Sequence, residues 1–186
     1  MLNNYFPNVA QNWQAFTQSI QETVEMVILS GLIAFIVSIF LAIILIITKR
    51  GGIKENFIFF NIFDKLINLF RSIPFIILIV ALIPLTTLIS GTAIGVAGTI
   101  FPLVVGITPF FARQIESALN DIDPGLIETG KAIGLTNWQI VRGIYLHEGI
   151  VSITRMTTTT IVSLIGLTAI VGVVGGGGLG NFAIQY

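Results

Sequence analysis

The sequence predicts an all-α fold, a polytopic membrane helix bundle with four spans. Of its 186 residues, 54% are hydrophobic and only 10% are charged, whereas charged residues make up about 25% of a soluble domain. The mean hydropathy is +0.96. Long apolar segments without charge recur along the chain, and roughly 20 such residues in a helix cross a bilayer core. A disordered chain is excluded, and an ordinary soluble domain is strongly disfavoured.

Composition also limits the chemistry that the chain can carry. The nine Lys and Arg residues balance nine Asp and Glu residues, so no basic excess points to nucleic acid. The chain has no cysteine and a single histidine, His147. Disulfides, thiolate metal sites and multi-histidine metal sites are therefore excluded within one chain.

The first predicted span is Met26–Ile47, which contains no charged residue. Its side chains are apolar enough to insert without help from other segments. A cleaved signal peptide is the alternative interpretation. The preceding region carries Glu22 and Glu25 but no Lys or Arg, and the apolar run is too long for a signal peptide. A membrane span is therefore favoured.

The next uncharged stretch, residues 72–112, must contain a reversal. As one helix it would be about 60 Å long, twice the thickness of the membrane. The small polar sequence Ser90–Thr92 is the natural turn, which gives a second span at Leu66–Ile89 and a third at Ala93–Ala112. Prolines inside membrane helices favour a bundle, in which neighbouring helices satisfy the freed carbonyls. These prolines are Pro74, Pro84, Pro102 and Pro109.

The fourth predicted span is Ile153–Val174, with Arg155 at its inner end. The hydroxyls of Thr157–Thr160 can bond to carbonyls of their own helix or to a neighbouring helix. A glycine-rich segment, residues 175–180, follows. It lacks the lysine of a phosphate-binding loop, and we interpret it as a flexible or tightly packed turn, with part of an outer gate as the alternative.

The basic residues predict the orientation of the chain. The positive-inside rule places segments that carry Lys and Arg in the cytoplasm. One group lies between spans one and two and the other between spans three and four, so the N-terminus is predicted outside. The first group is Lys49, Arg50, Lys54, Lys65 and Arg71, and the second is Arg113, Lys131, Arg142 and Arg155. We interpret Arg71, and the phenylalanines between Phe57 and Phe70, as interface anchors.

The cytoplasmic segment 113–152 predicts two helices joined by a hinge. Asp123 followed by Pro124 is a helix start, and Gly134 is a left-handed helix stop. Thr136 and Gln139 have the spacing of a capping box that starts the second helix. The spacing of Leu126, Gly130 and Ile133 gives the first helix an apolar face, and that of Trp138, Val141 and Tyr145 gives the second helix another.

A short helix with an apolar face on the cytoplasmic side is a docking element for a partner. A helix that lies on lipid is the alternative. Lys131 is outweighed by Glu128 and Asp123, which argues against lipid as the main partner.

At this segment the sequence resembles the membrane subunits of binding-protein-dependent ABC importers. Their signature is Glu-Ala-Ala, three residues and Gly, followed by an apolar helix. Here it reads Glu128-Thr129-Gly130-Lys131-Ala132-Ile133-Gly134, with Ile140 and Leu146 beyond. Thr129 and Gly130 replace the two alanines, and His147 stands where proline is usual.

Within that superfamily the chain is most similar to the methionine-import permeases. The similar stretches are Leu69–Ile76, Gly91–Gly95 and Gly177–Gly180. The resemblance covers roughly residues 22–186.

The resemblance implies a single permease domain over residues 1–186, with 113–152 as its coupling loop. The implied function is import of methionine, as the D- or L-form, or of a related amino acid across the bacterial cytoplasmic membrane. The implied partners are an ABC ATPase subunit that binds the ATP, an extracellular substrate-binding lipoprotein, a second copy of this chain and membrane lipid. The chain itself would be no enzyme and would hold no cofactor. The implied ATPase-coupling residues are Glu128, Thr129, Gly130, Ala132 and Gly134.

Two other classes of function remain to be weighed. An ion-coupled carrier or channel usually places carboxylates or histidine in mid-membrane, and none of the predicted spans carries one. An intramembrane enzyme needs a nucleophile with a base, or paired carboxylates. His147 and Glu148 are adjacent, and adjacent residues of a helix do not face each other. For Glu128, a solvated carboxylate favoured by the helix dipole is the alternative to an ATPase contact.

The end of the sequence leads to one further expectation. Four spans from an outside N-terminus end outside, and residues 181–186 carry no charge. Proteins of the resembled family continue into a fifth span and finish in the cytoplasm with basic residues. We therefore expect about 30 further residues after Tyr186, enough for one span and a short tail.

Overall fold

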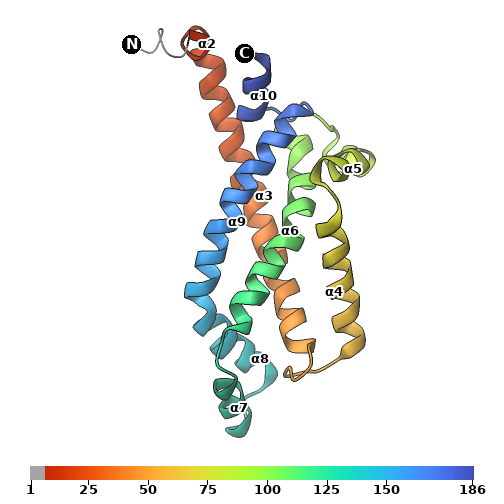
Figure 1. The fold of residues 1–186 in the computed structure, drawn as a ribbon, viewed down its shortest axis with the longest axis vertical. Coiled ribbons are helices and arrows are strands. Elements are labelled where there is room, and N and C mark those ends of the chain that lie inside the picture. The colour runs from red at the N-terminus through yellow and green to blue at the C-terminus, as the bar shows by residue number, and fades with distance from the viewer. Residues whose placement is uncertain (1–6) are drawn as a thin grey trace. The chain divides into compact units, whose positions relative to one another are not determined.

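The computed structural model describes residues 7–186, which are helical throughout apart from short connections (Figure 1). The predicted all-α class is therefore confirmed. The helices are α2 (Pro7–Gln11), α3 (Trp13–Thr48), α4 (Phe57–Ser72), α5 (Phe75–Ser90), α6 (Gly95–Asn120), α7 (Pro124–Ala132), α8 (Asn137–Ile140), the π-helical turn η1 (Val141–Leu146), α9 (His147–Val173) and α10 (Gly178–Gln185).

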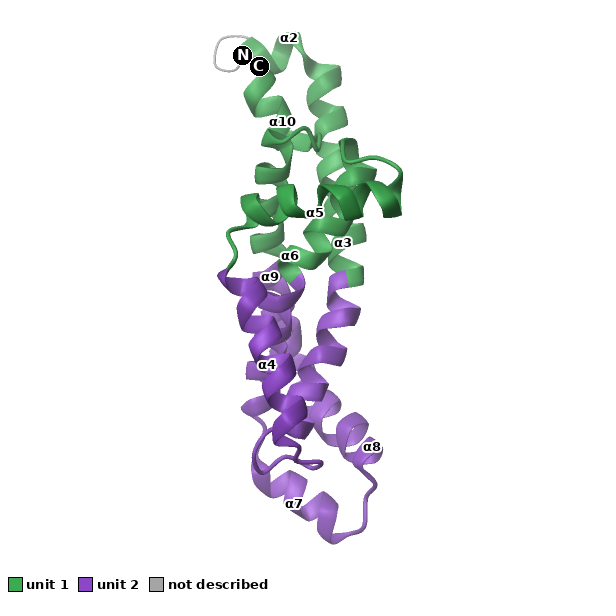
Figure 2. Cartoon of the chain, turned by 90° about the vertical axis from the view of Figure 1, so that its right-hand side faces the viewer, with its two compact units in different colours: residues 1–33, 73–107, 161–186 green, residues 34–72, 108–160 purple. Residues whose placement is uncertain are grey.

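The chain forms two compact units (Figure 2). Unit 1 takes the residues up to 33 together with 73–107 and 161–186. Unit 2 takes residues 34–72 and 108–160. Helices α3, α6 and α9 are each divided between the units, with one segment in unit 1 and another in unit 2. Each unit is therefore a small helical bundle.

Within the described residues, three continuous helical stretches are long and apolar enough to cross a membrane: Trp13–Thr48, Gly95–Asn120 and Asn137–Val173. Helices α4 and α5 meet the same criterion only when taken together, as a broken span or a re-entrant loop. The count therefore becomes four when this pair is one span. The outside N-terminus stays a prediction from the basic residues.

The predicted second span, Leu66–Ile89, is wrong as one helix. Helix α4 ends at Ser72 and α5 begins at Phe75. Pro74 disfavours the helical conformation of the residue before it and has no N–H to donate, and its ψ of 132° is that of an extended residue. A helix end is found at the predicted turn Ser90–Thr92, because Gly91 ends α5 with a φ of +73° and its N–H donates to the Thr87 carbonyl at 2.9 Å.

The other long helices extend beyond the predicted spans. Helix α3 begins at Trp13 rather than at Met26, and α6 continues past Ala112 to Asn120. Hydropathy detects only the apolar part of a helix, whereas the backbone hydrogen bonds continue through polar residues. Within the predicted cytoplasmic segment 113–152, α6 covers the start and the helix from Asn137 covers the end.

In unit 1, α10 is held against the first part of α3. The Gly178 N–H donates to the Glu22 carboxylate at 2.7 Å, and the Leu179 N–H donates to the Thr23 hydroxyl at 2.9 Å. These bonds satisfy two of the N–H groups that a helix start leaves free. The rings of Phe16 and Phe182 add an edge contact, with centroids 5.4 Å apart. Figure 1 shows α10 alongside α3 accordingly.

The glycine-rich segment is a tightly packed turn, as one of the two predictions states. Gly175, Gly177 and Gly178 all have positive φ, between +71° and +87°. Beside this turn α9 and α10 touch through their backbones. A Cβ added at Gly172 would lie 2.6 Å from the Cα of Gly180, and one added at Gly180 would lie 2.8 Å from the Cα of Ala169.

The four consecutive threonines of α9 bond to their own helix. The hydroxyls of Thr157 and Thr160 each donate to the carbonyl four residues earlier at 2.8 Å. Those of Thr158 and Thr159 do the same at 3.1 and 3.3 Å. This is the first of the two arrangements that the sequence left open.

Candidate functional site

Helix α7 begins where the sequence predicts it. The carboxylate of Asp123 accepts the Gly125 N–H at 2.8 Å, and Pro124 occupies the first helical position. An aspartate cap followed by proline satisfies one free N–H and presets the first backbone angle. The start of the coupling segment is thus fixed by three consecutive residues.

The end of α7 is a Schellman motif centred on Gly134. The Leu135 N–H donates to the Gly130 carbonyl, and the Gly134 N–H donates to the Lys131 carbonyl, both at 3.0 Å. The φ of Gly134 is +82°, the left-handed conformation that this motif requires. The predicted helix stop is confirmed.

The next helix starts at the predicted capping box. The Thr136 N–H donates to the Gln139 side-chain oxygen at 2.8 Å, and the Gln139 N–H donates to the Thr136 hydroxyl at 3.4 Å. Leu135 therefore links two helix ends whose backbone groups are both satisfied. Such a connection gives the hinge one well-defined geometry.

Gly130 lies where α7 packs closely against the following helix. The residue is buried in unit 2. A Cβ added there would lie 2.8 Å from Ile144 Cδ1 and 3.4 Å from Leu135 Cδ1. The missing side chain lets the backbone of α7 approach η1 closely. A small residue at this position therefore sets the distance between the two helices.

The other signature residues lie at the surface of unit 2. Glu128, Thr129, Ala132 and Gly134 are all exposed. Within residues 7–186 the structure gives the Glu128 side chain no hydrogen bond and no ion pair. It is the fifth residue of α7, beyond the first turn in which the helix dipole acts on a carboxylate. The helix dipole therefore gives this carboxylate little stabilisation, and the contact of Glu128 with an ATPase stays a prediction.

The apolar faces of the segment are only partly as predicted. Val141 and Tyr145 are buried, but the Trp138 side chain is 66% exposed. The grouping of Trp138 with those two residues is therefore wrong. The turn η1 is π-helical, with hydrogen bonds between residues i and i+5. Residues before this turn are therefore rotated about the helix axis relative to their positions in a regular α-helix. Leu126 of α7 is 43% exposed, and Ile133, the residue that caps the end of α7, is 70% exposed.

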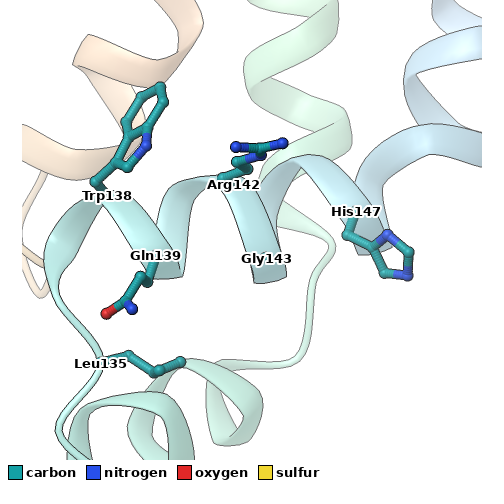
Figure 3. A pocket seen from close by; sticks show the side chains of 6 residues that line it. All are labelled: Leu135, Trp138, Gln139, Arg142, Gly143 and His147. Carbon is teal, nitrogen blue, oxygen red and sulfur yellow. The ribbon is translucent and has the colours of Figure 1, made fainter.

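An open groove of about 650 Å³ follows this part of the helix (Figure 3). It begins beside the hinge and continues along α8 and η1 to the start of α9. Its lining residues are Leu135, Trp138, Gln139, Arg142, Gly143 and His147. We call the exposed part of α7 together with this groove the coupling surface, after the role predicted for it.

A second cluster in unit 2 consists of charged residues that the sequence analysis did not bring together. Arg113 of α6 forms ion pairs with Asp64 of α4 and, at 2.6 Å, with Glu116 of α6. Its guanidinium also donates to the Asp64 carbonyl at 3.4 Å. Arg113 is thus a helix residue with two ion-pair partners, not a loop cation. The spacing of Arg113 and Glu116 was a readable signal, whereas nothing local identifies Asp64.

Lys49 joins this cluster from the end of α3. Its ammonium group donates to the side-chain oxygen of Asn120. Burial lowers the pKa of Lys49, and the nearby Glu116 carboxylate opposes that shift. With Lys49 included, the two cations and two carboxylates of the cluster are electrically neutral. Glu116 is only 8% exposed. The neighbouring cations lower the free-energy cost of burying its charge.

Replacing Gly134 by valine is expected to loosen the end of α7. A left-handed conformation costs an L-residue about 1–2 kcal/mol, and more for a β-branched side chain. We expect amide exchange at Gly130–Thr136 to accelerate about fivefold or more, measured by hydrogen–deuterium exchange. Gly134→Asn is the control, because asparagine tolerates this conformation. Equal exchange in both variants and the parent would show that the glycine is not needed.

The chain matches one family model. The family described as binding-protein-dependent transport system inner membrane component matches residues 46–186. The match includes the coupling surface and the Arg113 cluster. It also includes the helices α4 to α10 in full.

Several curated proteins are similar to the chain over most of its length. The probable D-methionine transport system permease protein of Vibrio cholerae is 43% identical over 165 residues, which cover 89% of this chain and 73% of that protein. Its counterpart from Pasteurella multocida is 42% identical over 94% of this chain and 80% of that protein. The D-methionine transport system permease protein of Escherichia coli K12 is 41% identical over 76% of this chain and 65% of that protein.

Solved structures show the same architecture. A chain of the MetNI methionine ABC transporter in inward-facing conformations matches with a TM-score of 0.92 at 40% identity, covering 95% of this chain and 82% of that chain. A chain of an amino acid ABC transporter matches with a TM-score of 0.77 at 18% identity, which shows the shared fold alone.

Proposed function

Since the chain belongs to the family of binding-protein-dependent transport system inner membrane components, we propose that it is the membrane-spanning permease subunit of an ATP-driven methionine importer. The family places it in the bacterial inner membrane. Identity of 41–43% to D-methionine transport permeases supports methionine, as the D- or L-form, or a closely related amino acid as the substrate.

The observation that carries the proposal is the exposed, rigidly capped helix α7. Its two ends are fixed by local hydrogen bonds, its packing distance is set by Gly130, and Glu128 projects from it without a partner among the described residues. An exposed element with a defined geometry is suited to dock a second protein. We assign ATPase coupling to Glu128, Thr129, Gly130, Ala132 and Gly134.

The partners follow from this role. An ATPase subunit binds the ATP and contacts α7, and this chain itself holds no cofactor. A second copy of the chain completes the path of the substrate through the membrane. An extracellular lipoprotein delivers the substrate. Large apolar side chains with more than half of their surface exposed, such as Phe40, Leu32 and Val162, suit contact with lipid or with the second copy.

Transport would proceed by alternating access. When the ATPase subunits close on ATP, they move the two copies of α7, and the helices change between inward-open and outward-open arrangements. No covalent chemistry is needed from this chain. The chain lines the path of the substrate through the membrane and converts a displacement of α7 into a rearrangement of the spans.

Reconstitution tests this function directly. The chain, its ATPase subunit and the lipoprotein are placed in proteoliposomes, and uptake of labelled L- and D-methionine is measured with ATP and with a non-hydrolysable analogue. We expect uptake only with ATP, competed by unlabelled methionine more strongly than by lysine or glutamate. Uptake by the chain alone, driven by an ion gradient, would instead establish a secondary carrier. ATP-driven uptake that methionine does not compete would overturn the substrate.

A further inference from the structure

The Arg113 cluster joins helices that are far apart in the sequence. The guanidinium of Arg113 reaches Glu116 through one nitrogen and the Asp64 carboxylate through the other. The side chains of these residues are 19%, 10% and 27% exposed, in the order Arg113, Glu116 and Asp64. A forked cation between one buried and one partly buried carboxylate is directional, since both nitrogens must keep their partners.

Helix α4 has little else to fix its position on α6. Ile67 is its only buried residue, and it packs in a small apolar cluster with Leu45 and Ala112, to which Phe60 and Phe63 add partial burial. Apolar contacts of this kind are non-directional. The ion pair to Arg113, next to Ala112 in the sequence, therefore supplies the directional link between α4 and α6.

The same end of α6 leads into the coupling segment. Helix α6 ends at Asn120 and α7 begins at Pro124. Arg113 lies seven residues before Asn120, about two helical turns or 10 Å. Leu119 packs against α9 at Gly149, where an added Cβ would lie 2.9 Å from the Leu119 side chain. A displacement of α7 thus acts on a packed segment that contains the cluster.

We propose that Arg113 is a positioning residue for transport, which makes α4 follow α6 when the coupling segment moves. In this arrangement Asp64 is the attachment point on α4, and Glu116 fixes the guanidinium in its orientation. Lys49 and Asn120 attach the end of α3 to the same group. The proposal rests on the proposed transport function, but it concerns a link inside unit 2 that does not depend on which amino acid is carried.

The test uses the assembled complex and four variants of this chain. Arg113→Leu removes the cation, Arg113→Lys keeps the charge but loses the fork, and Asp64→Asn removes the carboxylate on α4. Lys65→Leu is the matched control, because Lys65 is an exposed cation on α4 with no ion pair within the described residues. Copurification of the ATPase is measured first and should be retained by all four.

The first readout is the number of methionine molecules imported per ATP hydrolysed. We expect a decrease of at least tenfold for Arg113→Leu and of several-fold for Arg113→Lys, with ATP hydrolysis within twofold of the parent. Asp64→Asn should lower the ratio several-fold, because Arg113 then loses its charged partner on α4, and Lys65→Leu should match the parent. An unchanged ratio in Arg113→Leu, or in a fully assembled Asp64→Asn complex, would overturn the proposal.

The second readout does not depend on the substrate. The chain contains no cysteine, so Ile67→Cys with Ala112→Cys provides a single crosslinking pair between α4 and α6. The parent complex should give the same crosslinking yield with and without ATP. In Arg113→Leu the yield should fall at least threefold when ATP is added. Equal crosslinking in both would disprove the link even if methionine proves to be the wrong substrate.

Discussion

Replacing Glu128 by lysine is expected to abolish stable association of the chain with its ATPase subunit while leaving membrane insertion intact. Glu128 lies mid-way along the exposed helix α7 and has no partner within the described residues, so its loss removes no contact inside the chain. In the complex, a reversed charge placed against a complementary surface costs several kcal/mol. About 3 kcal/mol corresponds to roughly a hundredfold weaker binding.

The measurement is copurification of the ATPase with the tagged permease, followed by titration of the complex in detergent. Glu148→Lys is the matched control, since Glu148 is an exposed carboxylate in the first turn of α9, outside α7. We expect that variant to retain at least half of the bound ATPase. If Glu128→Lys binds normally, the assignment of Glu128 is wrong. If both variants lose the ATPase equally, the segment acts through its overall charge and not through this residue.

Replacing Gly172 by alanine is expected to displace α10 from α9. The added methyl group would lie 2.6 Å from the Gly180 Cα, and this neighbour is backbone that cannot rotate away as a side chain can. Overpacking of this kind typically costs about 1–3 kcal/mol. The hydrogen bonds from Gly178 and Leu179 to α3 would be strained in consequence.

Alanine at Gly166 is the control for the second prediction. That glycine lies on the same helix with no atom within 4 Å of an added Cβ, so alanine there should be neutral or stabilise the helix by up to about 1 kcal/mol. The readouts are the thermal unfolding midpoint in detergent and maleimide labelling of Phe182→Cys, a position that is 8% exposed in α10. We expect labelling to rise about fivefold or more in Gly172→Ala only. Equal labelling of the two alanine variants would contradict the backbone contact.

The features that the sequence predicts best are those whose causes lie within a few residues. The cap at Asp123, the left-handed stop at Gly134 and the capping box from Thr136 to Gln139 are all confirmed. Each depends on hydrogen bonds between neighbouring backbone and side-chain groups, so the surrounding fold has little influence on them. The signature residues are thereby placed correctly, while their contact with an ATPase stays a prediction.

Helix ends inside the membrane segments were harder to predict. A hydropathy window reports where apolar residues stop, not where the backbone hydrogen bonds stop, so α3 and α6 exceed their predicted spans. The break before Pro74 was readable from the proline itself, but prolines also occur inside membrane helices. Pro84 is one such residue, since α5 continues through it. The sequence does not distinguish these two outcomes.

The contacts that stabilise each unit internally cannot be predicted from local sequence. Asp64 and Arg113 are 49 residues apart, and Glu22 and Gly178 are 156 residues apart. Nothing in either neighbourhood marks one residue as the partner of the other. Only the folded backbone brings them within hydrogen-bonding distance. A single sequence contains no covariation that could reveal such pairs.

The π-helical turn Val141–Leu146 makes the direction of the coupling surface depend on a residue count. A π-turn holds one residue more than the α-helical turn that it replaces, and one residue of an α-helix corresponds to about 100° of rotation. Loss of a single codon in this turn would restore a regular helix and rotate Trp138 and the attached α7 about the axis of α9. A deletion here would therefore re-aim helix α7 while every residue of α7 stayed the same.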